Sequence, residues 1–125
     1  MTVTRENKVA QFYKAADKKQ FHRLDAVDNS ILDNFLEETD ELAEAITNYV
    51  DKPNDETRAQ LCKEWADAQV TLSSIAWYFD IPADAAFNRV HNNNMTKVVD
   101  GKILRAPNGK ILKPEGYVKA DMKGL

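Results

Sequence analysis

Five acidic residues stand out because their spacing would bring them together. Glu37, Glu38 and Glu41 fall in one short stretch. Later in the chain, Glu64 and Asp67 are separated from each other by three positions. On an α-helix, at about 100° per residue, the first three lie within an arc of about 100° and the last two share a face. Carboxylate oxygens are the ligands that Mg²⁺ and Mn²⁺ prefer. The spacing therefore indicates a divalent-cation site, provided that two helices bring these groups together.

Two long predicted helices must position these acids. Apolar residues recur at helical spacing over residues 30–50 and again over about 55–79, and neither run contains glycine or proline. Ser30 is the predicted N-cap of the first helix, and Asn54 or Asp55 that of the second. Because the connection between the helices is short, we expect them to be antiparallel neighbours. Their two acidic faces would then meet.

The surroundings of Glu64 and Asp67 favour a cation site over a solvated helix face. We expect Lys63 not to face these acids, and the other flanking residues are mostly apolar: Leu61, Cys62, Trp65, Ala66, Ala68 and Val70. Like charges in such a groove repel one another and lose water, which raises their pKa values, and a divalent cation would relieve both costs. The alternative is that all five acids are ordinary solvated glutamates and aspartates. Single acidic faces usually are, but the double pattern favours the cation site.

The rest of the chain is predicted to be helical up to about residue 97. A short amphipathic helix is expected near residues 7–17, and another begins at Pro82. Beyond them, Gly-Lys-Ile-Leu occurs twice after turn dipeptides, which predicts a small hairpin with Pro107 and Asn108 near its turn. The sequence thus predicts one all-α domain over residues 1–125, with a helical core over about 7–97 and an extended or hairpin tail over 98–125.

Taken in order, these segments resemble a known enzyme superfamily. Glu37-Glu38-Thr39-Asp40-Glu41 followed by Glu64-Trp65-Ala66-Asp67 is similar to the EExxE…ExxD signature of the all-α NTP pyrophosphatases, the MazG-like and phosphoribosyl-ATP pyrophosphohydrolase-like superfamily. The segment from His91 to Lys97 resembles the family's Asn-Met-Ser-Lys segment, with Thr96 in place of serine. The tail from Asp100 to Tyr117 is also similar, so the resemblance spans nearly the whole chain. Residues 17–29, near the base pocket of relatives, show no clear match.

The resemblance implies a fold, a reaction and a role for each residue. The fold would be a MazG-like four-helix-bundle subunit that assembles as a dimer or tetramer. The reaction would be Mg²⁺-dependent cleavage of a nucleoside triphosphate to the monophosphate and pyrophosphate, with Mn²⁺ as a possible substitute, serving nucleotide-pool control. The implied catalytic residues are Glu37, Glu38, Glu41, Glu64 and Asp67. All of them except Glu37 would hold the metal, and Glu37 would position or deprotonate the attacking water.

The resemblance also implies residues that bind the phosphates of the substrate: Asn94, Lys97, Lys102, Lys110 and Tyr117. Asn94 and Lys97 match the family pattern and share a helix face, and the others would close over the triphosphate from the tail. Each of these two residues also has a plainer alternative role. Asn94 is equally suited to cap the C-terminal end of a helix, and Lys97 could be an ordinary solvated lysine. Arg105 and Lys113 would close over the triphosphate from the tail in the same way, although each of these tail residues taken alone is more often a solvated side chain.

Composition narrows the classes of function. The net charge of −3 gives no support for a nucleic-acid polymer or a membrane surface as partner. One cysteine, Cys62, excludes an intrachain disulfide framework, and no apolar signal segment or phosphate-binding glycine loop is present. We therefore expect a cytoplasmic enzyme, or one in the host cytoplasm if a phage encodes it.

Two other functions remain. Within the same class, the substrate would be phosphoribosyl-ATP. From another class, the chain would be a non-catalytic metal-binding helical scaffold. A di-iron carboxylate bundle is disfavoured because neither His22 nor His91 follows a glutamate by three residues.

Overall fold

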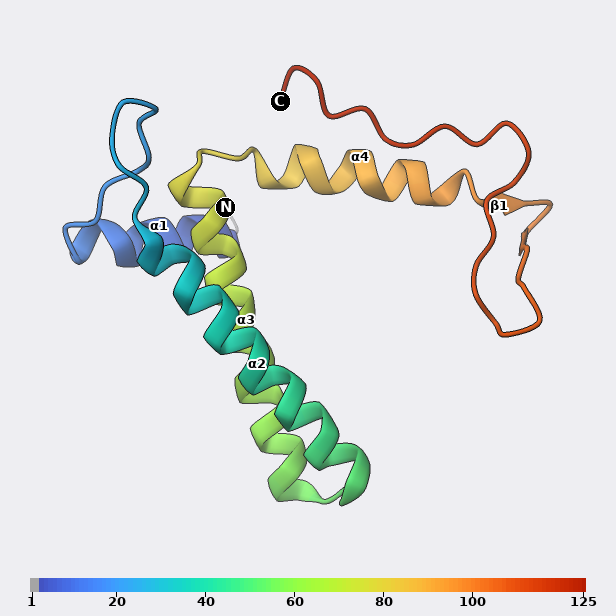
Figure 1. Cartoon of the computed structure of the whole chain (residues 1–125), viewed down its shortest axis with the longest axis horizontal. Helices are drawn as coiled ribbons and strands as arrows, with labels where there is room; N and C mark the ends of the chain where they lie inside the picture. The colour runs from blue at the N-terminus through green and yellow to red at the C-terminus, as the bar shows by residue number, and fades with distance from the viewer. Residues whose placement is uncertain (1–2) are drawn as a thin grey trace. The chain divides into compact units, whose positions relative to one another are not determined.

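The computed structural model describes residues 3–125, which form four helices and one two-stranded hairpin (Figure 1). The helices are α1 (Arg5–Ala15), α2 (Asn29–Asp51), α3 (Asp55–Tyr78) and α4 (Ala83–Met95). The strands are β1 (Val98–Val99) and β2 (Lys102–Ile103). The predicted all-α class is thereby confirmed, and none of these helices is long and apolar enough to cross a membrane.

The chain divides into two compact units at the boundary between Ile81 and Pro82. The first unit contains α1, α2 and α3, and the second contains α4, the hairpin and the tail. Since α4 belongs to the second unit, the packing of four helices into one bundle stays a prediction. The same holds for the single domain predicted over residues 1–125.

The antiparallel pair α2–α3 forms the main body of the first unit (Figure 1). Its turn is stabilised by a capping box, in which Thr57 N donates to Asn54 Oδ1 at 2.9 Å and Asn54 N donates to Thr57 Oγ1 at 3.1 Å. Asn54, one of the two predicted N-caps, is therefore the one used. These reciprocal bonds fix where α3 begins, and so set the register of its acids against α2.

The N-cap predicted for α2 is wrong. Asp28 caps this helix, and its Oδ1 atom accepts hydrogen bonds from Ser30 N at 3.0 Å and from Ser30 Oγ at 2.6 Å. A carboxylate at this position satisfies two donors of Ser30 at once, so the N-cap lies two residues earlier than predicted. Asp28 is itself held by α3, because its backbone N–H donates to Tyr78 Oη at 2.7 Å.

The core of the first unit is narrow and consists mainly of small side chains. Its buried apolar residues are Val9, Ile31, Ala45, Ala68, Ala76 and Tyr78. Small residues let helix backbones approach closely but cover little of the larger side chains around them. About half of each of Leu32, Leu36, Trp65 and Leu72 therefore remains exposed on α2 and α3.

The second unit contains two consecutive turns where one hairpin turn was predicted. β1 and β2 pair antiparallel across Asp100-Gly101, where both residues have positive φ angles of 51° and 72°. The predicted turn near Pro107 and Asn108 also forms and brings Arg105 opposite Ile111 in an isolated bridge. The repeated Gly-Lys-Ile-Leu strings thus follow two separate turns, and the sheet lies at the first of them.

Candidate metal centre

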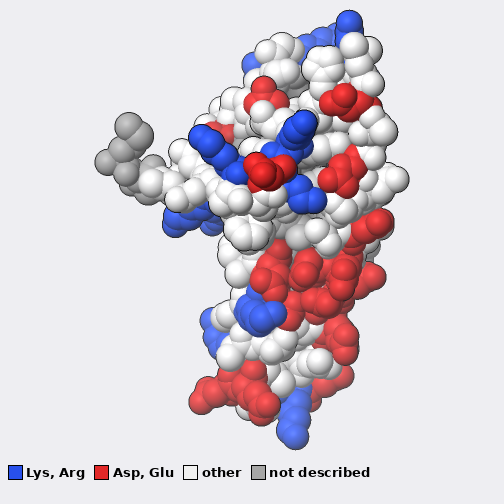
Figure 2. All heavy atoms as spheres, turned by 90° about the vertical axis from the view of Figure 1, so that its left-hand side faces the viewer, with Lys and Arg blue, Asp and Glu red and all other residues white. Residues whose placement is uncertain are grey.

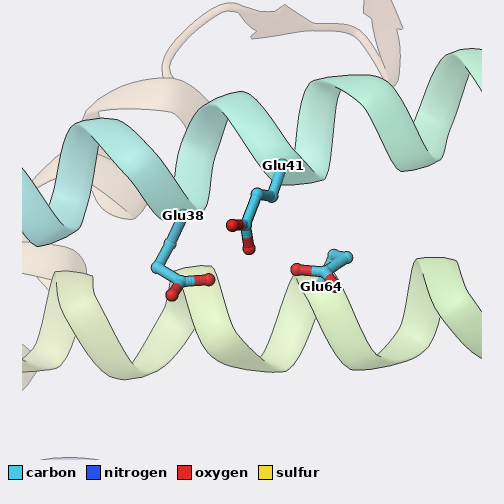
Figure 3. A group of neighbouring side chains, drawn as sticks. All are labelled: Glu38, Glu41 and Glu64. Carbon is cyan, nitrogen blue, oxygen red and sulfur yellow. The ribbon is translucent and has the colours of Figure 1, made fainter.

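Three of the five predicted acids meet between α2 and α3. Glu38 and Glu41 extend from α2 toward Glu64 on α3, and each offers one carboxylate oxygen within 4.8 Å of the other two (Figure 3). The predicted meeting of two acidic helix faces is confirmed for these residues. Figure 2 shows Asp and Glu side chains gathered in one patch over this helical pair.

Glu64 is the buried member of the cluster, with only 5% of its surface exposed. Its Oε1 atom accepts hydrogen bonds from Gln60 Nε2 at 2.6 Å and from Lys63 Nζ at 3.4 Å. Its Oε2 atom is shielded from solvent and, like Glu38 Oε2, has no hydrogen-bond partner among the described residues. A buried carboxylate oxygen without a donor is costly, and a cation is one kind of ligand that could satisfy these two atoms.

The pKa of Glu41, the third carboxylate of the cluster, is raised by repulsion from its neighbours. The negative charge of Glu38 is the largest cause that raises the pKa of Glu41 above its ordinary value of 4.5, and desolvation and Glu64 act in the same direction. Repulsion of this kind disfavours the state in which all three carboxylates are charged. A cation that contacts all three would reverse it.

The donor set fits a hard divalent cation. It consists entirely of carboxylate oxygens, and two of these residues carry an unsatisfied oxygen. Mg²⁺ and Mn²⁺ prefer such ligands, whereas zinc and copper sites generally include nitrogen or sulfur. Glu38, Glu41 and Glu64 are therefore the residues that would hold a metal ion, and its identity as Mg²⁺ stays a prediction.

The expectation that Lys63 does not face the acids is wrong. Its Nζ atom lies 2.8 Å from Asp67 Oδ2 and 3.4 Å from Glu64 Oε1. Residues four apart share a helix face, so Lys63 and Asp67 are natural partners. The hydrogen bond to Asp67 is the main cause that raises the pKa of Lys63. An internal ammonium group thus neutralises part of the charge that a metal would neutralise.

The other two predicted catalytic residues lie outside the three-carboxylate cluster. Asp67 is half-buried one helical turn beyond Glu64 and pairs with Lys63. Glu37 is exposed on α2 beside Glu38. The roles of Asp67 as a metal ligand and of Glu37 toward water stay predictions.

The residues predicted to bind phosphate all belong to the second unit. Three of them come together, because Lys97 Nζ donates to Asn94 Oδ1 at 3.2 Å and lies 5.6 Å from the centre of the Tyr117 ring. Lys102 lies in β2, and Lys110 follows the turn at Asn108-Gly109. Asn94 lies in the last turn of α4, and Thr96 takes the C-cap position, so Asn94 does not cap this helix.

A cleft of about 430 Å³ adjoins the cluster and includes residues that sequence reasoning missed. Glu41, Ala45 and Glu64 line it together with Glu44, Asn48 and Gln60. Helical spacing could have identified these residues, because it places them on the same helix faces as the predicted ligands. Glu44 and Asn48 are three and seven residues beyond Glu41, and Gln60 is four before Glu64. The cleft thus places two amide groups and a fourth carboxylate beside the candidate metal ligands.

Comparison with known proteins adds no assignment, because no family model matches the chain and neither does any curated protein.

The raised pKa of Glu41 predicts how stability depends on pH without metal. The folded protein holds the Glu41 proton at higher pH than the unfolded chain, so from 4.5 up to the raised pKa the folded state binds more protons. The free energy of unfolding should therefore fall as pH rises through this window. Urea unfolding in EDTA should show a smaller fall for Glu41→Gln than for wild type. Glu37→Gln, outside the cluster, should behave as wild type, and equal pH profiles for all three would refute the repulsion.

The Lys63 contacts predict a competition between ammonium and metal. Lys63→Met removes a positive group from Asp67 and Glu64, so it should tighten Mg²⁺ binding. An exposed pair of this kind contributes about 0.3–0.5 kcal/mol, so the Kd should fall about twofold. Calorimetric titration at low ionic strength measures this change, and Lys63→Arg, which keeps the pair, is the control. Weaker binding by Lys63→Met would show that Lys63 supports the site.

Proposed function

We propose that this chain is a Mg²⁺-dependent nucleoside triphosphate pyrophosphohydrolase of the all-α NTP pyrophosphatase superfamily. The reaction is attack of water on the nucleotide to give a nucleoside monophosphate and pyrophosphate. One observation carries the proposal: Glu38, Glu41 and Glu64 converge within 4.8 Å, and two of them retain a buried oxygen without a donor. Solvated surface glutamates would not leave such atoms unpaired.

The cleft beside the cluster supports a small-molecule substrate. Its volume of about 430 Å³ lies in the range of ligand-binding pockets, which is about 300–1,000 Å³. Its walls offer amide groups from Asn48 and Gln60, which can both donate and accept hydrogen bonds. A nucleotide carries matching groups on its base and sugar.

The uneven charge of the two units also suits a metal-bound polyphosphate. The unit up to Ile81 carries 9 basic and 16 acidic residues, whereas the unit from Pro82 to Leu125 carries 8 basic and 4 acidic residues. An acidic surface attracts cations and a basic surface attracts phosphate.

The residues of the proposed site have three separate roles: holding the metal, positioning water and binding phosphate. Glu38, Glu41, Glu64 and Asp67 would hold Mg²⁺, which supplies charge neutralisation to the phosphates and acidity to a nearby water. Glu37 would orient the water or accept its proton, and Asn94 and Lys97 would bind phosphate oxygens. Positioning and electrostatics then provide most of the acceleration, as in other phosphoryl transfers.

We further propose that the chain acts as a homodimer or homotetramer. Large apolar side chains on α2 and α3, including Leu32, Leu36, Val50 and Trp65, are at least half exposed. Monomeric proteins seldom expose many such residues on adjacent helices. A second copy would cover them, and light scattering at the mass of one chain would contradict this assembly.

The central test is release of pyrophosphate from a panel of ribo- and deoxyribonucleoside triphosphates. We expect Mg²⁺-dependent formation of monophosphate, with a loss of at least about 100-fold in Glu38→Gln and in Asp67→Asn because each removes a charged group from the transition state. Glu56→Gln, a matched change in the exposed first turn of α3, should keep full activity.

The outcomes separate the alternatives. Turnover of phosphoribosyl-ATP but of no common triphosphate would assign the other branch of the superfamily. Metal binding without turnover of any nucleotide would favour the scaffold. Full activity of both Glu38→Gln and Asp67→Asn would defeat the proposed function.

A further inference from the structure

The two oxygens of the Glu64 carboxylate have different surroundings. Oε1 accepts hydrogen bonds from Gln60 Nε2 at 2.6 Å and from Lys63 Nζ at 3.4 Å. A carboxylate oxygen offers about two acceptor sites, so these two donors fill Oε1. Oε2 is shielded from solvent and accepts no hydrogen bond from the described residues. A cation that approaches Glu64 therefore meets one occupied oxygen and one free oxygen.

Gln60 is the stronger of the two donors to Oε1. It precedes Glu64 by four residues on α3, so the two side chains share a helix face. The hydrogen bond is short, as is usual when the acceptor is ionised. The side chain of Lys63 is 64% exposed, and its closer contact is with Asp67 at 2.8 Å. Gln60 thus holds the Glu64 carboxylate without adding a positive charge that would repel a metal ion.

The number of free oxygens bears on which cation the cluster can hold. Glu38, Glu41 and Glu64 each bring one oxygen within 4.8 Å of the other two (Figure 3). Ca²⁺ takes about six to eight oxygen ligands and can bind both oxygens of one carboxylate. Mg²⁺ is smaller, requires a nearly octahedral shell and retains several waters, and Mn²⁺ accepts the same donors. Single-oxygen contacts from a few carboxylates therefore suit the smaller ions better.

We propose that Gln60 is a positioning residue that sets the cation selectivity of the carboxylate cluster. Because it occupies Oε1, it restricts Glu64 to a single-oxygen contact through Oε2 and so favours Mg²⁺ and Mn²⁺ over Ca²⁺. The inference deepens the proposed function, on which it rests for Mg²⁺ as the working ion. Cation binding tests it whether or not the protein turns over a nucleotide.

A purely structural role for Gln60 makes a different prediction. If the hydrogen bond only stabilised a buried charge, its loss would lower the stability of the fold or weaken the binding of every cation alike. A role in selectivity instead changes the ratio of the affinities for two cations. That ratio is therefore the quantity to measure.

The experiment is titration of the full chain with Mn²⁺, followed by electron paramagnetic resonance, and then displacement of the bound Mn²⁺ by Ca²⁺. Gln60→Met keeps the length of the side chain but removes the donor, which frees Oε1 for a second contact. Loss of a residue that supports a metal ligand changes metal affinity by about 10–100-fold. The ratio of Ca²⁺ affinity to Mn²⁺ affinity should therefore rise at least about tenfold.

The chain offers a matched control on the same helix. Gln69 Nε2 donates to Ser73 Oγ at 3.2 Å, also four residues away, so Gln69→Met removes the same kind of donor outside the cluster and should bind both cations as wild type does. Gln60→Lys keeps a donor and should retain the wild-type ratio, although its charge weakens the binding of both cations. Thermal melts establish that each variant is folded. Gln60→Ala, which lets a displaceable water reach Oε1, replaces an unfolded Gln60→Met and should show the same rise.

The possible results are distinct. An unchanged ratio in Gln60→Met or Gln60→Ala would overturn the inference, as would an equal change in Gln69→Met or no Mn²⁺ binding by the wild type. A raised ratio in a protein that hydrolyses no nucleotide would uphold the role of Gln60 and refute the proposed function. Mg²⁺-dependent hydrolysis with an unchanged ratio would do the reverse.

Discussion

Repulsion among the carboxylates of Glu38, Glu41 and Glu64 is the constraint on which the account of this protein depends. Two helices press these groups together at their interface, although each would be more stable alone in water. Packing along α2 and α3 must outweigh that cost in the metal-free protein. Small residues such as Ala45 and Ala68 make the close approach of the helices feasible, and the capping box at Asn54 fixes their register.

Neutralisation of the cluster is shared unevenly among its neighbours. Gln60 and Lys63 both donate to Glu64 Oε1, and Lys63 also pairs with Asp67. The opposite oxygen of Glu64, Oε2, accepts no hydrogen bond from the described residues, although it is shielded from water. The molecule thus satisfies one side of the cluster with its own side chains, and a cation could satisfy the other side.

Sequence periodicity predicted the parts of the fold that follow from local rules. Four helices, the short connection between α2 and α3 and the meeting of Glu38 and Glu41 with Glu64 all follow from helical spacing and turn chemistry. The errors arose where side chains compete for the same role. Asp28 displaced Ser30 as a cap because a carboxylate accepts two hydrogen bonds, and Lys63 reached Asp67 across one helical turn.

Other features depend on contacts between distant segments and could not be predicted from spacing. Asn93 lies in a run of three asparagines from which the sequence singled out Asn94, yet Asn93 alone of the three anchors Tyr117 and Val118. Lys97 and Lys113, which both lie over the Tyr117 ring, likewise come from segments separated by two turns.

Titration with Mn²⁺, followed by the loss of the free-ion signal in electron paramagnetic resonance, tests the central claim most directly. Wild-type protein should bind Mn²⁺ in competition with Mg²⁺. Loss of a residue that supports a metal ligand weakens metal affinity by at least about tenfold, and loss of a ligand itself should weaken it no less. Glu64→Gln should therefore bind Mn²⁺ at least about tenfold more weakly than wild type. Glu56→Gln should bind as wild type does. Equal Mn²⁺ affinity in Glu64→Gln and wild type would contradict a metal site between α2 and α3.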